Sequence, residues 1–310
     1  MTKRRKLPQQ LGLAVALAAL MIGLSAAHPN FVSLGNLINL VRQISINGIL
    51  AVGVTYVLLT GGVDLSLGSL VALTGVIAAM FAHPGQHAVM VPIAAGVAGG
   101  ALCGAINGFL VTRGRMAPFV VTLGMMTSAR GLALLLSGGR PVSNLSPAFT
   151  GIGSGDFAGI PAPTWILLTV AAVAHVFLRR MRLGRHVYAV GGNESAARAS
   201  GVHVSTVKLI CYTICGAMAG LAGVVLASRI TTGQPNAGIG YELDAIAAVV
   251  IGGTSLNGGS GGVGGTILGA LLIGVINNGL DLLNVSSYYQ QVIKGLIIVG
   301  AVWLDRSKKS

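Results

Sequence analysis

Long apolar stretches recur along this chain, and they constrain its fold more than any other feature. A helix of about 20 mostly apolar residues is long enough to cross the hydrocarbon core of a bilayer. Only 9% of the residues are charged, whereas a soluble domain usually has about 25%. A chain so poor in charge cannot cover its own surface against water. The sequence therefore predicts a polytopic membrane protein and excludes a nucleic-acid-binding protein.

Each apolar stretch is expected to be a helix, because backbone groups inside a bilayer find hydrogen-bond partners only within the protein. The predicted fold is thus an all-α transmembrane bundle. The first stretch resembles a secretory signal, since it follows Lys3-Arg4-Arg5-Lys6 and ends at Ser25-Ala26-Ala27. We count it as a retained span because the charge pattern is then consistent. The ten expected spans are 11–27, 36–58, 64–82, 88–110, 117–136, 164–180, 206–228, 242–255, 262–281 and 288–304.

The positions of the basic residues predict the orientation. With ten spans and both termini in the cytoplasm, 15 of the 20 Lys and Arg residues fall in cytoplasmic segments or at the same membrane face. The opposite loops clearly hold only Arg140 and Arg229. This is the positive-inside bias of multi-pass membrane proteins, and it explains the net charge of +13. The expected cytoplasmic segments are 1–10, 59–63, 111–116, 181–205, 256–261 and 305–310.

Two long connections and a local repeat define the organisation of a single domain, 1–310. The external connection, 137–163, is rich in Gly, Ser and Pro, which favours a loop or an interrupted helix. A shift of 170 residues superposes six of the twelve positions in 99–110 on 269–280. Over the whole chain, however, this alignment gives no more identical residues than the skewed composition would give by chance. The candidate repeat relates spans 2–5 to spans 7–10 (halves 36–136 and 206–305), and an offset of five spans makes the copies inverted.

Several kinds of chemistry are not indicated by the sequence. Cys103, Cys211 and Cys215 lie in apolar runs, so they are expected to be small buried hydrophobic residues. The histidines form no cluster at metal-ligand spacing, and no catalytic triad can be argued. The glycine-rich run 252–265 lacks the lysine of a phosphate-binding loop. We therefore expect no enzyme activity, metal or cofactor in this chain.

Four ordered motifs resemble the ribose-type branch of bacterial sugar ABC importer permeases. They are TGGVDLSLGSLVALTG at 60–75, GRHVYAVGGNESAARASGV at 184–202, GYELDAIAAVVIGGTSLNGG at 240–259 and NNGLDLLNVSSYYQQVIKG at 277–295. The resemblance covers about 36–305. It implies a permease subunit in the bacterial cytoplasmic (inner) membrane that pairs with a second permease chain, in the simplest case another copy. It also implies a dimer of ATP-binding cassette ATPases, which holds ATP and Mg, and a periplasmic binding protein that delivers a monosaccharide such as ribose.

A short helix is predicted within the cytoplasmic connection 181–205. Asn193 is a good N-cap, Glu194 suits the first helical turn, and Gly201 can end the helix in the left-handed conformation. The resemblance implies that this segment is the coupling helix that contacts the ATPase. Gly201 stands seven residues after Glu194, whereas the broader importer signature has six, so an ordinary surface helix is the alternative. The expected coupling residues are Asn193, Glu194, Ser195, Ala196, Ala197, Arg198 and Gly201.

Polar residues within the spans are the candidates for a translocation path. A charge at the centre of a membrane helix costs about 2.5–3.5 kcal/mol on insertion scales, so Arg130 and Lys294, like Arg42, need a partner, a wet cavity or a route to the interface. They either line the path or pair structurally. Asp64 follows a glycine pair and either caps the next helix or pairs with a cation. Three amides, expected near the inner ends of spans 4 and 9, either line the path or hold helices together: Asn107, Asn277 and Asn278.

Two features leave alternatives open. Glu242 and Asp244 open span 8, where they either complement the helix dipole or contact an arriving binding protein. A secondary carrier for a small neutral solute, driven by an ion gradient, is the alternative function. Such a carrier is expected to have paired carboxylates near the bilayer midplane, and the spans contain no obvious pair.

Overall fold

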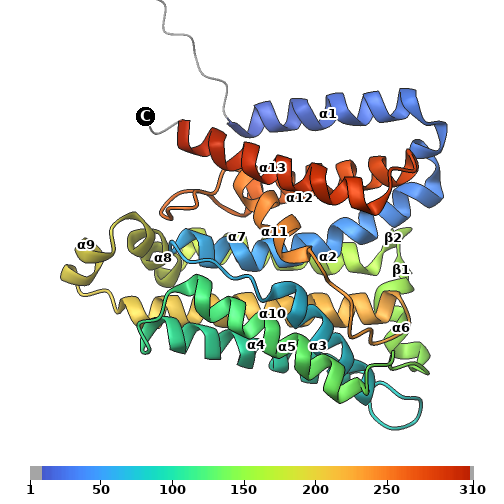
Figure 1. The fold of residues 1–310 in the computed structure, drawn as a ribbon, viewed down its shortest axis with the longest axis horizontal. Helices are drawn as coiled ribbons and strands as arrows, with labels where there is room; N and C mark the ends of the chain where they lie inside the picture. Colours follow the sequence, from blue (N-terminus) through green and yellow to red (C-terminus); the bar gives the residue numbers. More distant parts are fainter. Residues whose placement is uncertain (1–8, 308–310) are drawn as a thin grey trace, which may run out of the picture.

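The computed structural model describes residues 9–307 as a bundle of roughly parallel and antiparallel helices (Figure 1). The expectations that rest on Lys3, Arg4, Arg5 and Lys6, and on Lys308 and Lys309, lie outside the described residues. The helices are α1 (Gln9–Ala27), η1 (Pro29–Val32), α2 (Leu34–Leu59), α3 (Leu67–Phe81), α4 (Met90–Thr112), α5 (Pro118–Ser137), α6 (Pro147–Ser154), α7 (Ala162–Arg180), α8 (Arg182–Gly192), α9 (Glu194–Ala199), α10 (Val204–Arg229), α11 (Tyr241–Ile251), α12 (Val263–Leu282) and α13 (Ser287–Ser307). A two-residue hairpin, β1 (Asp156–Phe157) and β2 (Ile160–Pro161), lies between α6 and α7.

All ten expected spans coincide with helices, and the prediction of an all-α bundle is confirmed. Seven helices of the described part are long and apolar enough to cross a membrane: α1, α2, α4, α5, α7, α10 and α12. The helices in two of the expected spans are short, since α3 has 15 residues and α11 has 11. Both short helices follow segments of irregular backbone within the bundle.

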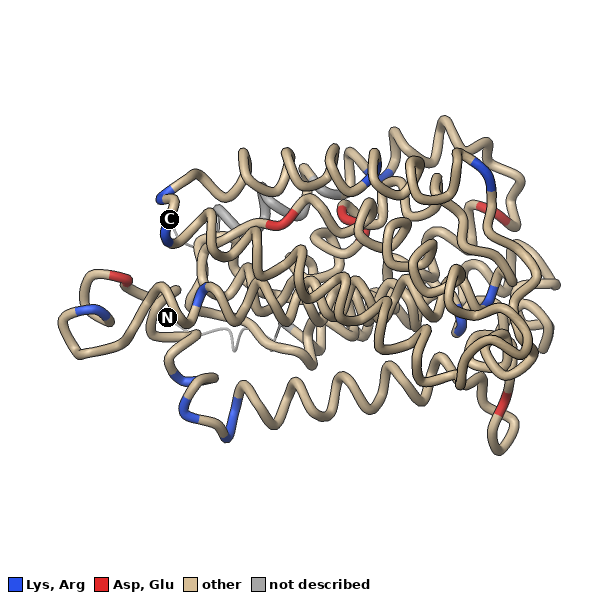
Figure 2. Tube along the Cα trace, turned by 90° about the horizontal axis from the view of Figure 1, so that it is seen from below, with Lys and Arg blue, Asp and Glu red and all other residues tan. Residues whose placement is uncertain are grey.

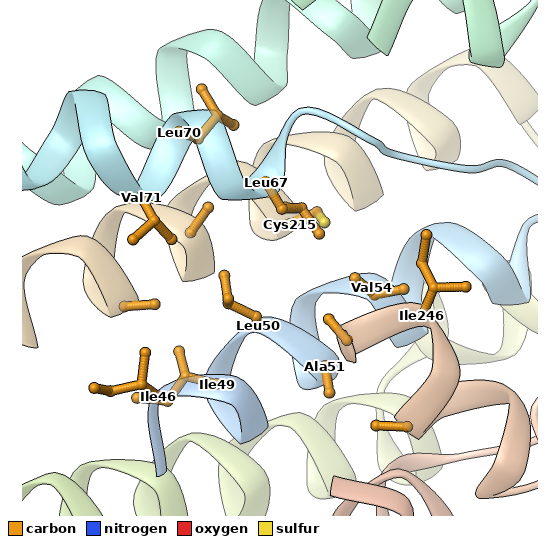
Figure 3. Packing of buried hydrophobic residues seen from close by; sticks show 14 of the residues in the cluster. Ile46, Ile49, Leu50, Ala51, Val54, Leu67, Leu70, Val71, Cys215 and Ile246 are labelled. Carbon is orange, nitrogen blue, oxygen red and sulfur yellow. The ribbon is translucent and has the colours of Figure 1, made fainter. Parts of the chain in front are cut away.

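The core forms where α2 and α10 pack against α3 and α11. Ile46, Leu50 and Val54 of α2 belong to one cluster with Leu67 of α3 and Cys215 of α10 (Figure 3), and all five are almost fully buried. Large apolar side chains on the outer helices are exposed instead, for example on α4, α5 and α7. Apolar side chains on the outside suit a chain whose periphery faces hydrocarbon.

The closest helix pair is α4 with α10, and glycines permit their contact. Gly100 of α4 faces the backbone of Gly216 and Gly220, so that a Cβ atom on Gly100 would overlap the carbonyl oxygen of Gly216. Gly104 approaches Gly216 and the Tyr212 carbonyl in the same way. Small residues at four-residue spacing are typical of tightly packed membrane helices.

The two ends of the bundle differ in charge. The end that carries α8 and α9 gathers many of the Lys and Arg residues (Figure 2). Arg182 and Arg185 lie on α8, Arg179 and Arg180 end α7, and Lys208 pairs with Glu194 of α9. The sequence predicts a cytoplasmic location for the two residues of α8 and places the other three at the same membrane face. The predicted internal connection 181–205 contains α8 and α9, and the external connection 137–163 contains α6 and the hairpin.

Candidate functional site

The two short helices α3 and α11 begin inside the bundle rather than at its ends (Figure 1). The chain leaves α2 through Gly61, whose φ of +74° is accessible to glycine, and residues 62–66 form no regular structure. The Tyr212 hydroxyl of α10 donates to the Val63 carbonyl at 3.2 Å and so replaces a helical hydrogen bond. Within the expected span 64–82, the helix begins at Leu67.

The first turn of α3 and the start of α11 meet beside this irregular segment, 62–66, which we call the break. Gly68 packs so closely on Gly238 and Glu242 that a Cβ atom at Gly68 would overlap the Gly238 carbonyl oxygen and the Glu242 carboxylate. From this point α3 runs toward the end with α6, where Ser146 N donates to Ala82 O at 2.7 Å. The helix α11 runs toward the opposite end. Two helix N-termini, each with a partial positive charge, thus converge inside the bundle.

A cavity of about 380 Å³ opens beside this meeting point. Its polar lining groups come from three helices: the hydroxyls of Ser69 and Thr127, the Arg130 guanidinium and the Glu242 carboxylate. Its remaining lining residues are Met126 and Ile239. Arg130 is fixed in place, since one terminal nitrogen donates to the Pro235 carbonyl at 2.7 Å and to the Ala237 carbonyl at 2.8 Å. Closely spaced donors and acceptors of this kind can bind the hydroxyl groups of a small neutral ligand.

Two carboxylate–amide clusters flank the break. Before α3, Asp64 Oδ1 accepts from the backbone and hydroxyl of Ser66 at 2.9 and 2.6 Å, and Asn107 of α4 donates to the Ser66 hydroxyl at 3.1 Å. In α11, Asp244 Oδ2 accepts from Asn277 of α12 at 3.1 Å and from Lys294 of α13 at 2.9 Å. Each cluster ties a short helix to its longer neighbour. Asp64 therefore holds the turn before α3 and has no cation partner among the described residues.

The remaining predicted path residues lie farther from the cavity. Asn278 exchanges two side-chain hydrogen bonds, of 2.8 and 3.0 Å, with Asn36 in the first turn of α2. This contact places Asn277 and Asn278 at the end of the bundle opposite α8 and α9, so the expectation that they lie near the inner end was wrong. The reason is geometric: α12 starts beside α8 and α9, and its later residues lie at the far end. Arg42 donates to the Ser154 carbonyl at 2.7 Å.

The predicted short helix in the internal connection is present as α9. The Asn193 side chain caps it by accepting from Ala196 N at 2.9 Å, and Gly201 has a φ of +84°. Glu194 pairs with Lys208 at 2.6 Å and with Arg198 at 3.0 Å. The hydrogen bond from Lys208, more than any other contact, holds the pKa of Glu194 below its ordinary value. The pair with Lys208 ties α9 to the first turns of α10, whereas the pair with Arg198 lies within α9.

The sequence interpretation missed Ser69, Thr127 and Glu242 as neighbours of Arg130. Ser and Thr are common in membrane helices, so Ser69 and Thr127 give no signal in the sequence, and only the fold brings them together. Glu242 was noted for its place at the start of span 8, but not for a cavity. Among the residues that the structure describes, no group of three His, Cys, Asp or Glu side chains is placed to hold a metal ion.

The comparison with known proteins decides the family. Residues 36–302 match the family described as the permease component of the branched-chain amino acid transport system. The chain belongs to this permease family. It is 47% identical to the ribose import permease protein RbsC of Escherichia coli K12, over 95% of this chain and 93% of that protein. The ribose import permease protein of Bacillus subtilis 168 is also 47% identical, over 97% of this chain and 94% of the relative.

A more distant relative carries a different sugar in its name. The L-arabinose transport system permease protein AraH of Escherichia coli K12 is 38% identical, over 97% of this chain and 91% of its own length. No solved structure matches the chain. These similarities confirm the resemblance seen in the sequence motifs. The protein is a multi-pass membrane permease, and as a permease component it is a transport subunit rather than an enzyme.

Proposed function

We propose that this permease imports a monosaccharide of the ribose type, and that the cavity at the meeting point of α3 and α11 lies on the path of the sugar. The observation that carries the proposal is the set of four polar groups, from three helices, that line one cavity beside this meeting point. Hydroxyl groups of a sugar can donate to Glu242 and accept from Arg130, while Ser69 and Thr127 can do either. The names of the relatives support this substrate class.

The topology that we propose has ten spans, with α3, α11 and α13 added to the seven long apolar helices, and with both termini in the cytoplasm. In this arrangement the single domain 1–310 contains two inverted halves, 36–136 and 206–305. The packing supports the repeat, since α10 contacts α3 and α4 as α2 contacts α11 and α12. Asn107 and Asn277, equivalent in the repeat, each belong to a carboxylate–amide cluster. Broken helices that meet at a repeat interface are typical of transporter binding sites.

Energy is proposed to come from a separate dimer of ATP-binding cassette ATPases, which would hold ATP and Mg, while this chain would hold no cofactor. The cap and ion pairs of α9 support its role as the contact with that ATPase, because they make a short helix rigid at the end of a long one. The coupling residues are those of 193–198 together with Gly201. A second permease chain, proposed to be another copy, and a periplasmic sugar-binding protein complete the importer in the cytoplasmic (inner) membrane.

The remaining path candidates are proposed to fix the positions of the helices around the break rather than to bind sugar directly. They are Asp64, Asn107, Asn277 and Lys294, whose hydrogen bonds fix α3 and α11 against their neighbours, and Asn278, which bonds α12 to α2. Arg130 is proposed to do both, because it anchors the loop before α11 and also lines the cavity.

Reconstitution of the permease with its ATPase and its binding protein in vesicles tests this function. We expect uptake of labelled ribose that requires ATP on the ATPase side and is not replaced by a proton or sodium gradient. Uptake by the permease alone, driven by such a gradient, would instead support a secondary carrier. Glu194→Lys is expected to uncouple ATP hydrolysis from uptake, with Asp156→Lys in the external hairpin as the control.

A further inference from the structure

A second cavity lies at the end of the bundle that carries α8 and α9, away from the break. It has a volume of about 1000 Å³ and lies between the α4–α5 turn and the start of α10, with α9 as one wall. Its charged lining residues are Arg113, Arg115, Arg198, Lys208 and Glu194. Four cations thus face one carboxylate. Glu194 already pairs with Arg198 and Lys208, whereas Arg113 and Arg115 have no ion pair within residues 9–307.

The turn that carries the two unpaired arginines has a fixed backbone. After α4 ends, Gly114 N donates to Phe109 O and Met116 N donates to Leu110 O, each at 3.3 Å. A Cβ atom at Gly114 would lie 2.5 Å from the Leu110 carbonyl oxygen, so only glycine fits there without a shift. The turn therefore holds Arg113 and Arg115 toward the cavity at the end of two apolar helices.

The cavity continues into an apolar surface on α5. Met116, Ala117 and Pro118 form part of the cavity wall, and the next residues, Phe119 and Val120, are 58% and 54% exposed. A cationic site that borders an exposed apolar helix face, at the end of membrane-length helices, matches the two parts of a phospholipid. Basic sites at the cytoplasmic membrane face attract anionic lipids.

We propose that this cavity binds the headgroup of one anionic phospholipid of the inner leaflet, with its acyl chains along the exposed face of α5. The phosphate then lies between Arg113, Arg115 and Lys208, and it screens the repulsion among them. The headgroup cavity is separate from the sugar cavity, and the proposal rests on the proposed topology, which places this end of the bundle in the cytoplasm. Because Glu194, Arg198 and Lys208 also fix α9, lipid binding is expected to rigidify the helix proposed to contact the ATPase.

Native mass spectrometry of the purified permease with added lipid tests this site. We expect one molecule of phosphatidylglycerol to bind with high affinity and phosphatidylcholine to bind weakly. The variant Arg113→Gln/Arg115→Gln is expected to bind phosphatidylglycerol roughly 30-fold more weakly, given the usual contribution of a basic residue near an anionic membrane surface. Arg113→Lys/Arg115→Lys is expected to retain most of the binding.

The matched control is Arg182→Gln/Arg185→Gln on α8, which removes the same charge at the same end of the bundle but outside the cavity. We expect this variant to bind phosphatidylglycerol as the unmodified chain does. An equal loss of phosphatidylglycerol binding in both double variants would overturn the proposal, because any basic residue at this end would then attract the lipid equally. Displacement of the lipid by millimolar inorganic phosphate would also contradict it, since the site would then bind free phosphate without need of acyl chains.

Discussion

Lys294 of α13 and Asp244 of α11 form an ion pair of 2.9 Å inside the helix bundle. The Asp244 side chain is only 4% exposed and also accepts from Asn277, so its charge is satisfied by two neighbouring helices. This pair explains how a lysine is tolerated in an apolar span. It also gives the short helix α11 a fixed position against α12 and α13.

Lys294→Met is expected to destabilise the permease strongly, because it leaves the Asp244 carboxylate buried without a cation. Breaking one partner of a buried ion pair typically costs about 3–5 kcal/mol. Thermal unfolding in detergent measures the effect. The double variant Lys294→Met/Asp244→Asn is expected to recover much of the loss, because no buried charge remains. A single variant as stable as the unmodified chain would show that the pair does not hold α11.

Gly100→Ala is expected to force α4 and α10 apart, because the new Cβ atom would overlap the Gly216 carbonyl oxygen. Overpacking in a close contact typically costs about 1–3 kcal/mol. Gly124→Ala on α5 is the matched control, since a Cβ atom there meets nothing within 4 Å. Both variants are compared by thermal unfolding in the same detergent. The packing account fails if Gly100→Ala is as stable as Gly124→Ala.

Glu194 is expected to make the stability of α9 depend on pH. Its pKa is lowered in the folded chain, chiefly by the hydrogen bond from Lys208. The stabilisation is therefore complete above the pKa of an unfolded glutamate, about 4.3, and is lost as the pH falls through the lower folded pKa. Hydrogen exchange of the α9 amides, corrected for intrinsic rates, measures this dependence. Glu194→Gln is expected to abolish this pH dependence. If the dependence survives in the variant, another titrating group causes it.

Arg130→Lys is expected to lower ATP-driven sugar uptake by roughly tenfold or more. A lysine keeps the charge but cannot reproduce the planar guanidinium group that bonds the Pro235 and Ala237 carbonyls and lines the cavity. A hydrogen bond to a charged group is worth about 1.5–3 kcal/mol. Arg140→Lys, at an exposed external position, is the control. Equal uptake by both variants would remove Arg130 from the path.

The spans and the short helix α9 could be predicted from the sequence because they depend on local patterns. Apolar length fixed the positions of the spans, and Asn193 and Gly201 marked the ends of α9. The glycines of α4 at four-residue spacing, from Gly96 to Gly108, were an available signal for the contact with α10.

The cavity could not be predicted in the same way. Ser69, Thr127 and Glu242 lie far apart in the chain and become neighbours only because α3 and α11 begin inside the bundle. That geometry depends on the close contact of Gly68 with Gly238, which involves the backbone and has no local sequence pattern. The partner of Lys294 was missed for the same reason, since Asp244 lies fifty residues away.

The most direct test of the sugar path is a thiol label at Thr127 in the reconstituted importer. The chain carries Thr127→Cys with its three native cysteines replaced by alanine. We predict that a bulky maleimide at this position abolishes ATP-driven ribose uptake, and that saturating ribose slows the labelling. The same label at Leu135→Cys, which is also exposed on α5 but does not line the cavity, is expected to leave uptake unchanged. Undiminished uptake by a fully labelled Thr127→Cys importer would contradict the assignment of this cavity to the sugar path.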